Sequence, residues 1–199
     1  MERGDGVTGV VLAGGRGSRM EGLDKGLVPV GGLAMVDHVI RALRPQVDAL
    51  VINANRERGT YRARGALVVP DGIGGFPGPL AGLLAALEVV TTPWVVTAPC
   101  DVPVLPRDLV ARLRRCQRTA ATPGAVVWGA GRRQPALALV PVALAGDLAA
   151  FLEAGGRSVT AWQQRHGFAD CVFDDPAPAF ANVNTPQDRA ELEGILGSG

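Results

Sequence analysis

The sequence has few cysteines and no excess of charge of either sign. Its 199 residues include only the cysteines Cys100, Cys116 and Cys171, and the formal net charge is +1. An odd number of cysteines without a C-x-x-C pair predicts neither a disulfide framework nor a zinc site, as is usual in the reducing cytoplasm. A near-neutral chain also lacks the basic surplus that nucleic acids and anionic membranes attract. We therefore expect a cytoplasmic protein whose main partner is a small molecule.

Long hydrophobic runs are also missing. No apolar stretch approaches the roughly 20 residues that a helix needs to cross a bilayer. Residues 1–9 are charged and contain glycine where a signal peptide would be apolar. We expect neither a membrane span nor export. A hydrophobic content of 47% is enough for the core of one α/β domain, and we expect a single domain over 1–199 with flexible ends at 1–7 and 197–199.

Two common nucleotide-binding motifs are absent. The chain contains no G-x-x-x-x-G-K-[ST], which excludes a P-loop NTPase on pattern. The dinucleotide fingerprint G-x-G-x-x-G is only partly matched, because Gly15 and Gly17 are followed by Met20 where the third glycine belongs. A Rossmann dehydrogenase is therefore disfavoured.

What the chain does have is a short apolar run that ends in a glycine-rich loop. Residues 8–12 read as a buried strand, and Ala13-Gly14-Gly15-Arg16-Gly17-Ser18-Arg19 follows them. Glycine lets backbone N–H groups approach an oxyanion, and arginine adds a guanidinium that stays charged. Lys25, in a glycine-flanked loop close behind, supplies another cation. This stretch predicts a phosphate site, with Arg19 and Lys25 favoured over Arg16 as its cations.

The apolar pattern predicts an α/β fold. Apolar runs at 8–12, 49–52, 67–69 and 94–98 read as buried strands, and helical spacings occur at 35–43, 83–90 and 109–113. In the last third, 125–128 and 135–140 form either a hairpin or a loop to a further strand. Helices at 144–152 and 158–166, a strand at 169–173 and a helix that starts at Thr185-Pro186 follow. We expect a Rossmann-like, mostly parallel central sheet with helices on both faces.

Polar side chains close several of the predicted strands. Besides the glycine loop, they are Asn53, Asp71 and Asp101. Ligands of open parallel sheets bind outside the carboxyl ends of the strands, so these residues predict a site. Strand ends are often polar simply because they meet solvent, which explains Asn53 and Asp71 equally well. Asp101 is held between Pro99 and Pro103, and a rigid carboxylate near a phosphate site is a natural Mg²⁺ ligand.

With these residues assembled, the chain resembles the MobA-type nucleotidyltransferases, the molybdenum cofactor guanylyltransferases. The matching motifs are spread over nearly the whole chain and are Leu12-Ala13-Gly14-Gly15 with Arg19-Met20, Asp24-Lys25-Gly26-Leu27, Asn53-Ala54-Asn55, Gly78-Pro79-Leu80-Ala81-Gly82, Pro99-Cys100-Asp101 with Pro103, and Asn182-Val183-Asn184-Thr185-Pro186. The first is shared with sugar nucleotidyltransferases, and the last three are more specific. Glu21 departs from the pattern, because a second glycine often follows Met20 in the family. The resemblance implies one nucleotidyltransferase domain with the fold of the nucleotide-diphospho-sugar transferases.

The resemblance also implies an activity, the transfer of GMP from GTP to the terminal phosphate of molybdopterin with release of pyrophosphate. Arg19, Lys25 and Asp101 would serve the reaction, with Mg²⁺ on Asp101. The residues implied in GTP binding are Leu12, Ala13, Gly14, Gly15, Lys25, Asn53, Asp71 and Asp101. Those implied on the molybdopterin side are Gly82, Arg157, Asn182 and Asn184. Further partners would be the proteins that deliver the cofactor and the molybdoenzymes that accept it.

Other functions remain open on the sequence. A related transferase could use CTP on molybdopterin, or a nucleotide on a sugar phosphate or phospholactate. A non-catalytic nucleotide-binding protein would keep the glycine loop but could lose the metal carboxylate, so the presence of both Lys25 and Asp101 favours an enzyme. A dehydrogenase is a distant third because of Met20.

Overall fold

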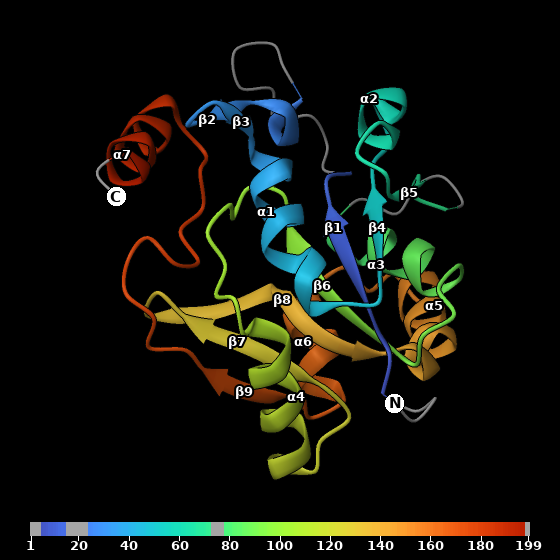
Figure 1. Ribbon diagram of the computed structural model, residues 1–199. Helices are drawn as coiled ribbons and strands as arrows, with labels where there is room; N and C mark the ends of the chain where they lie inside the picture. The colour runs from blue at the N-terminus through green and yellow to red at the C-terminus, as the bar shows by residue number, and fades with distance from the viewer. Residues whose placement is uncertain (1–4, 15–23, 73–77, 198–199) are drawn as a thin grey trace.

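The protein is built around a seven-stranded sheet with the strand order β5-β4-β1-β6-β8-β7-β9 (Figure 1). The computed structural model describes residues 5–14, 24–72 and 78–197. The strands are β1 (Val7–Leu12), β4 (Ala49–Asn53), β5 (Leu67–Val69), β6 (Trp94–Pro99), β7 (Ala125–Gly129), β8 (Arg132–Pro141) and β9 (Ala169–Val172). Only β8 pairs antiparallel with its neighbours, β6 and β7, and the other pairs are parallel. The predicted mostly parallel α/β sheet is therefore confirmed.

Helices cover both faces of this sheet, as the sequence predicted (Figure 1). The longer helices are α1 (Met35–Leu43), α3 (Pro79–Leu87), α4 (Leu109–Ala120), α5 (Ala145–Glu153), α6 (Val159–Arg165) and α7 (Pro186–Leu196). One core cluster joins α1 and α4 to the sheet, and another joins α3, α5 and α6 to it. Neighbouring β1 residues enter different clusters: Val11 the first and Val10 the second. A strand buried on both faces reads as the continuous apolar run seen in the sequence.

One connection differs from the prediction, and another decides between two open readings. The sequence placed the helix after the Gly/Pro-rich stretch at 83–90, but α3 spans Pro79–Leu87. Proline is well tolerated in the first turn of a helix because it lacks only an N–H that has no intrahelical partner there. The region 125–140, for which two readings were open, is a hairpin in which Gly129 of β7 pairs with Arg132 of β8.

Several short elements were not predicted. They are the 3-10 helices η1 (Lys25–Leu27), η2 (Arg44–Gln46) and η3 (Val142–Leu144), the strands β2 (Pro29–Val30) and β3 (Leu33–Ala34), and the helix α2 (Arg58–Arg62). Each is too short to show hydrophobic periodicity in the sequence.

A small third core holds the C-terminal part of the chain near the carboxyl end of the sheet. Val28 and Val30, beside η1 and in β2, pack with Met35 of α1, Val183 and Leu192 of α7. The predicted start of α7 is confirmed, because Thr185 and Asp188 form a capping box. This packing brings residues 182–184 over the end of the sheet, where the predicted site lies. No described helix is long and apolar enough to cross a membrane.

Candidate functional site

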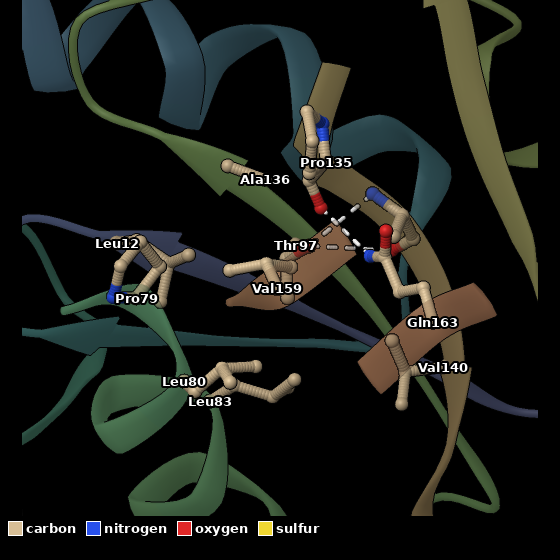
Figure 2. Close-up of a pocket in the computed structure, with 11 residues that line it drawn as sticks. Leu12, Pro79, Leu80, Leu83, Thr97, Pro135, Ala136, Val140, Val159 and Gln163 are labelled. Atoms are coloured by element: carbon tan, nitrogen blue, oxygen red, sulfur yellow. Dashed lines mark hydrogen bonds between the residues drawn. The ribbon is translucent and has the colours of Figure 1, made fainter. Parts of the chain in front are cut away.

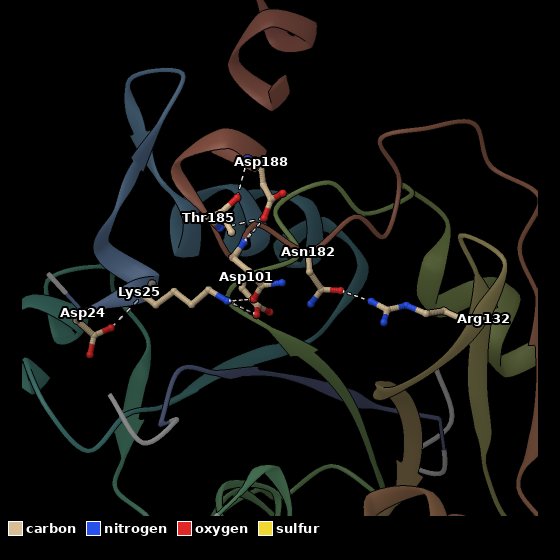
Figure 3. Close-up of polar contacts among 9 residues, drawn as sticks. Asp24, Lys25, Asp101, Arg132, Asn182, Thr185 and Asp188 are labelled. Carbon is tan, nitrogen blue, oxygen red and sulfur yellow. Dashed lines mark hydrogen bonds and ion pairs between the residues drawn. The ribbon is translucent and has the colours of Figure 1, made fainter. Parts of the chain in front are cut away.

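The centre of the site is an ammonium group between two oxygen atoms from distant parts of the chain (Figure 3). Lys25 Nζ lies 2.6 Å from Asp101 Oδ2 and 2.6 Å from Asn184 Oδ1. The three side chains come from η1, from the loop after β6 and from the segment before α7. The Lys25 and Asp101 side chains are only 13% and 20% exposed, so solvent screens their attraction incompletely.

The backbone around Lys25 is held by its neighbours. Asp24 caps η1, where its Oδ1 accepts hydrogen bonds from Gly26 N and from the Tyr61 hydroxyl. Burial and the hydrogen bond to Asp24 raise the pKa of Tyr61, so its hydroxyl stays protonated and able to donate. A local cap and a distant tyrosine therefore place the lysine at the end of the sheet.

Asp101 is equally well fixed. The N–H of Cys100 donates to the carbonyl oxygen of Leu12 at 3.0 Å, and the N–H of Val183 donates to the carbonyl oxygen of Asp101 at 2.8 Å. The loop is thus held between β1 and the C-terminal segment. Burial raises the pKa of the neighbouring Cys100 thiol to about 12, which agrees with the sequence-based view that this cysteine is an inert buried residue.

A second polar cluster lies at the ends of β4 and β5. Asp71 Oδ1 accepts from Asn53 Nδ2 at 2.8 Å, and Asp71 Oδ2 accepts from Asn55 Nδ2 at 2.7 Å. The Asp71 N–H in turn donates to Asn55 Oδ1, and Asn55 Nδ2 also reaches the carbonyl oxygen of Gly14. Both carboxylate oxygens are therefore oriented by amide groups. The arrangement joins the loop after β1 to the ends of β4 and β5.

Two glycines allow this cluster to pack. A Cβ atom on Gly14 would lie 2.5 Å from Asn53 Oδ1, and a Cβ atom on Gly82 would lie only 2.1 Å from it. Any side chain at either position would displace the Asn53 amide. The structure thus places Gly82, in α3, against a residue of the predicted GTP site, although the resemblance assigned it to the molybdopterin side.

The remaining predicted residues lie in different places. Asn182 Oδ1 accepts from Arg132 Nη2 at 2.6 Å, and the Asn184 N–H donates to Asp188 Oδ2 (Figure 3). Arg157 donates to the carbonyl oxygens of Leu152 and Gly156 at the C-terminal end of α5, so these contacts do not join it to the asparagines. The Ala13 N–H donates to the carbonyl oxygen of Asn53. Gly15, Arg16 and Arg19 lie outside the described residues.

A hollow lies beside this site, between α3, α6 and the sheet (Figure 2). Its lining is mostly aliphatic and includes Leu12, Pro79, Leu80 and Val159. Its polar members are Thr97 and Gln163, and Gln163 Nε2 donates to the carbonyl oxygen of Pro135 at 2.8 Å. None of the described residues that line it carries a charge. This lining suits an apolar group better than a phosphate.

Two residues of the site were missed by the sequence reasoning. Asn55 was noted only as part of a motif, although its amide holds both Asp71 and Gly14. Arg132 was not singled out. The local feature that could have pointed to it is its position directly after Gly129-Ala130-Gly131.

The site can supply a metal with one well-placed carboxylate. Within the described ranges, no three His, Cys, Asp or Glu side chains come together as a ligand set. This fits Mg²⁺, which commonly takes one or two protein carboxylates and completes its octahedron with substrate phosphates and water. It does not fit a structural zinc site, which needs four protein ligands.

The chain is similar to a known protein family. The sequence profile of the MobA-like NTP transferase domain matches residues 9–167. The chain belongs to the MobA-like NTP transferase family. Like other members, it is a nucleotidyltransferase, and the matched region contains Lys25, Asn53, Asp71 and Asp101.

Relatives and solved structures agree with this family. A protein named molybdenum cofactor guanylyltransferase from Cupriavidus taiwanensis is 50% identical over 186 residues, covering 91% of this chain and 93% of the relative. The crystal structure of molybdopterin-guanine dinucleotide biosynthesis protein A from Archaeoglobus fulgidus has a TM-score of 0.79 at 23% identity, covering 96% of this chain and all of that one. A Mycobacterium tuberculosis protein solved in complex with manganese has a TM-score of 0.69 at 22% identity, covering 96% of this chain and 99% of that one. The two structures confirm the nucleotidyltransferase fold.

Proposed function

We propose that this MobA-like protein transfers GMP from GTP to the terminal phosphate of molybdopterin and releases pyrophosphate. Its relatives at about 50% identity, aligned over nine-tenths of the chain, are named for this guanylyl transfer. The observation that carries the proposal is the contact of Lys25 with both Asp101 and Asn184, because it joins the predicted nucleotide side to the predicted acceptor side.

On the nucleotide side, Lys25 and Asp101 bind the triphosphate. The ammonium would neutralise phosphate oxygens, and the Asp101 carboxylate would hold Mg²⁺. The metal would neutralise charge on the phosphates of the bound nucleotide. Asp101 and Asn184 take two of the three N–H donors of the Lys25 ammonium, which leaves one for a phosphate oxygen. Gly15 and Arg19, in the glycine-rich loop, are proposed to add N–H and guanidinium donors to the same phosphates.

Base selection is assigned to Asp71. An ionised carboxylate can accept about four hydrogen bonds, and the amides of Asn53 and Asn55 take one on each oxygen. The remaining lone pairs match a base edge with two adjacent donors. Guanine has such an edge in its N1–H and 2-amino groups, whereas the corresponding edge of cytosine carries one donor and acceptors. Leu12, Ala13, Gly14 and Asn53 complete the proposed GTP site around this carboxylate.

On the acceptor side, we assign Asn182 and Asn184 to molybdopterin. Asn184 lies against Lys25, so an acceptor bound there would bring its phosphate next to the nucleotide. Gly82 and Arg157 are implied on this side by the family resemblance. Gly82 contributes indirectly through the space it leaves for Asn53, and Arg157 donates to the carbonyl oxygen of Leu152 in α5.

The reaction needs no nucleophile from the protein. An oxygen of the acceptor phosphate attacks the α-phosphorus of GTP in line, and a new P–O–P bond forms as the bond to the β-phosphate breaks. The leaving pyrophosphate carries away the electron pair of the broken bond. Both reactants are anionic, so the residues contribute mainly by orienting them and by neutralising their charge.

Pyrophosphate release from a panel of GTP, CTP, ATP and UTP, each with Mg²⁺ and molybdopterin, tests the proposal. We expect release with GTP and its loss in Asp101→Asn. The matched control is Asp174→Asn, because that side chain is 97% exposed and lies outside the site.

Each contrary outcome would overturn one assignment within the proposed function. Release with CTP alone would overturn the guanylyl assignment. Release only with a sugar phosphate or phospholactate as acceptor would overturn the molybdopterin assignment. Full activity of Asp101→Asn would overturn the metal assignment, and tight GTP binding without release under any condition would point to a non-catalytic nucleotide-binding protein.

A further inference from the structure

Arg132 lies beside the proposed acceptor residues, at the start of β8 (Figure 3). The turn before it consists of Ala130 and Gly131, with φ values of 51° and 72°. Two central residues with positive φ are typical of the tight type I′ turn, whose twist matches that of the strands it joins. The hairpin end is therefore a rigid support for the arginine that follows it.

The C-terminal segment is packed against the same hairpin. Phe180 is 1% exposed, and a Cβ atom on Gly129 would lie 2.6 Å from its ring, so the ring lies directly on the hairpin backbone. The Phe180 N–H donates to the carbonyl oxygen of Val104. This packing sets the position of Asn182, two residues further on, opposite Arg132.

Among the described residues, the Arg132 guanidinium has a neutral hydrogen-bond partner and no charged one. Its described hydrogen bond is to a neutral oxygen, Asn182 Oδ1, at 2.6 Å, and Arg132 is exposed. Within the parts of the chain that the structure describes, no carboxylate lies within ion-pair distance of it. The next residue in the strand, Arg133, behaves differently, because it pairs with Asp170 at 2.6 Å.

The segment 182–184 relates the position of Arg132 to that of Lys25. Asn182 contacts Arg132 and Asn184 contacts Lys25, while buried Val183 lies between them and donates to the Asp101 carbonyl. Alternate residues of an extended segment are roughly 7 Å apart. Lys25 and Arg132 thus contact alternate residues of one segment, Asn184 and Asn182.

We propose that Arg132 is an acceptor-binding residue whose guanidinium donates to the acceptor substrate further from the nucleotide than Lys25. Its bond to Asn182 Oδ1 does not use the Asn182 Nδ2 donors, so the two side chains can offer adjacent N–H groups. A planar set of donors suits the carbonyl and ring nitrogen edge of a flat heterocycle, and a guanidinium can also stack on one. The inference rests on the proposed function, because it concerns the acceptor of that reaction.

Steady-state kinetics with each substrate varied in turn test the role of Arg132. We expect Arg132→Gln to raise the acceptor KM about tenfold or more, the loss typical of a hydrogen bond from a charged group, with the GTP KM unchanged. Arg132→Lys should recover part of the loss, since it keeps the charge but not the forked donors. Arg118→Gln is the matched control, because Arg118 is 60% exposed in the last turn of α4 and pairs with Asp5.

Arg132 could act only by positioning Asn182. To test this, the double variant Arg132→Gln/Asn182→Ala is compared with Asn182→Ala alone. A further rise in acceptor KM supports direct contact, and no further rise overturns it. An unchanged acceptor KM in Arg132→Gln also overturns the inference while guanylyl transfer stands. If the wild type uses a sugar phosphate or phospholactate instead of molybdopterin, the proposed function fails, and the same KM comparison with that acceptor decides the role of Arg132. If no acceptor is used at all, both fail.

Discussion

Lys25 Nζ lies 2.6 Å from Asp101 Oδ2, although 76 residues separate the two in the chain. The cation that we assign to the nucleotide phosphates thus rests on the carboxylate that we assign to the metal. The pair keeps both groups oriented in the absence of substrate, and the same ammonium also holds Asn184. A change at Lys25 should therefore affect the nucleotide and the acceptor together.

Replacement of Lys25 tests this relationship. We expect Lys25→Ala to lower kcat/KM for GTP by about a hundredfold or more, the usual loss for a donor that stabilises transition-state charge. Lys25→Arg should retain more activity, because it keeps the charge. The acceptor KM should also rise in Lys25→Ala, and an unchanged acceptor KM would show that the contact with Asn184 has no role in acceptor binding.

Gly82 should tolerate no side chain. In Gly82→Ala the new Cβ atom would lie 2.1 Å from Asn53 Oδ1, so the amide must move. We expect a loss of about 1–3 kcal/mol in the free energy of unfolding, as for overpacking elsewhere, together with weaker GTP binding by calorimetry.

Gly146→Ala is the control for this change. Gly146 also lies in a helix, α5, but a Cβ atom there would have no neighbour within 4 Å. Alanine favours helices over glycine by about 1 kcal/mol, so this variant should be as stable as the wild type or more so. Equal stability of the two variants would contradict the close packing of Gly82 on Asn53.

The three cysteines should differ in reactivity. Burial raises the pKa of Cys100 to about 12 and also raises the pKa of Cys171, so both thiols stay protonated at pH 8. We expect Ellman's reagent to titrate one thiol in the folded protein, at half-buried Cys116, and all three after denaturation. Cys116→Ser should then give no rapid reaction, and a rapid thiol remaining in that variant would contradict the assignment.

The ionisation of Asp188 should make the free energy of unfolding depend on pH in the acid range. The N–H groups of Asn184 and Thr185 donate to its carboxylate and hold its pKa below the usual value. A lowered folded-state pKa stabilises the fold above the unfolded pKa of about 4, and this contribution is lost as the pH falls through the lower folded value.

The measurement is Tm as a function of pH for wild type and Asp188→Asn. The difference in Tm should be largest near neutral pH and shrink below about pH 4. Asp174→Asn, a nearly fully exposed position, is the control and should change Tm little at any pH. A difference that is constant across the pH range would exclude a role for ionised Asp188.

Much of the fold could be read from local pattern. Continuous apolar runs marked β1, β4 and β6 because parallel strands are buried on both faces, and the Thr185-Pro186 start of α7 was visible in its cap residues. The start of α3 was misplaced, because Pro79 within a glycine-rich stretch reads as a loop until the helix that follows is seen. The choice between a hairpin and a loop at 125–140 needed the pairing itself.

The site, like the fold, was predicted in part from the sequence. The types of residue at the strand ends, including Lys25, Asp71 and Asp101, were evident from the sequence, because motif and residue chemistry are local properties. Their partners were decided by the tertiary structure. It brought Asn184 to Lys25 across 159 residues, Gly82 onto Asn53, and Arg132 to Asn182. Hydrophobic periodicity specifies which face of an element is buried, whereas contacts between side chains depend on how the strands are ordered in the sheet and where the C-terminal segment packs.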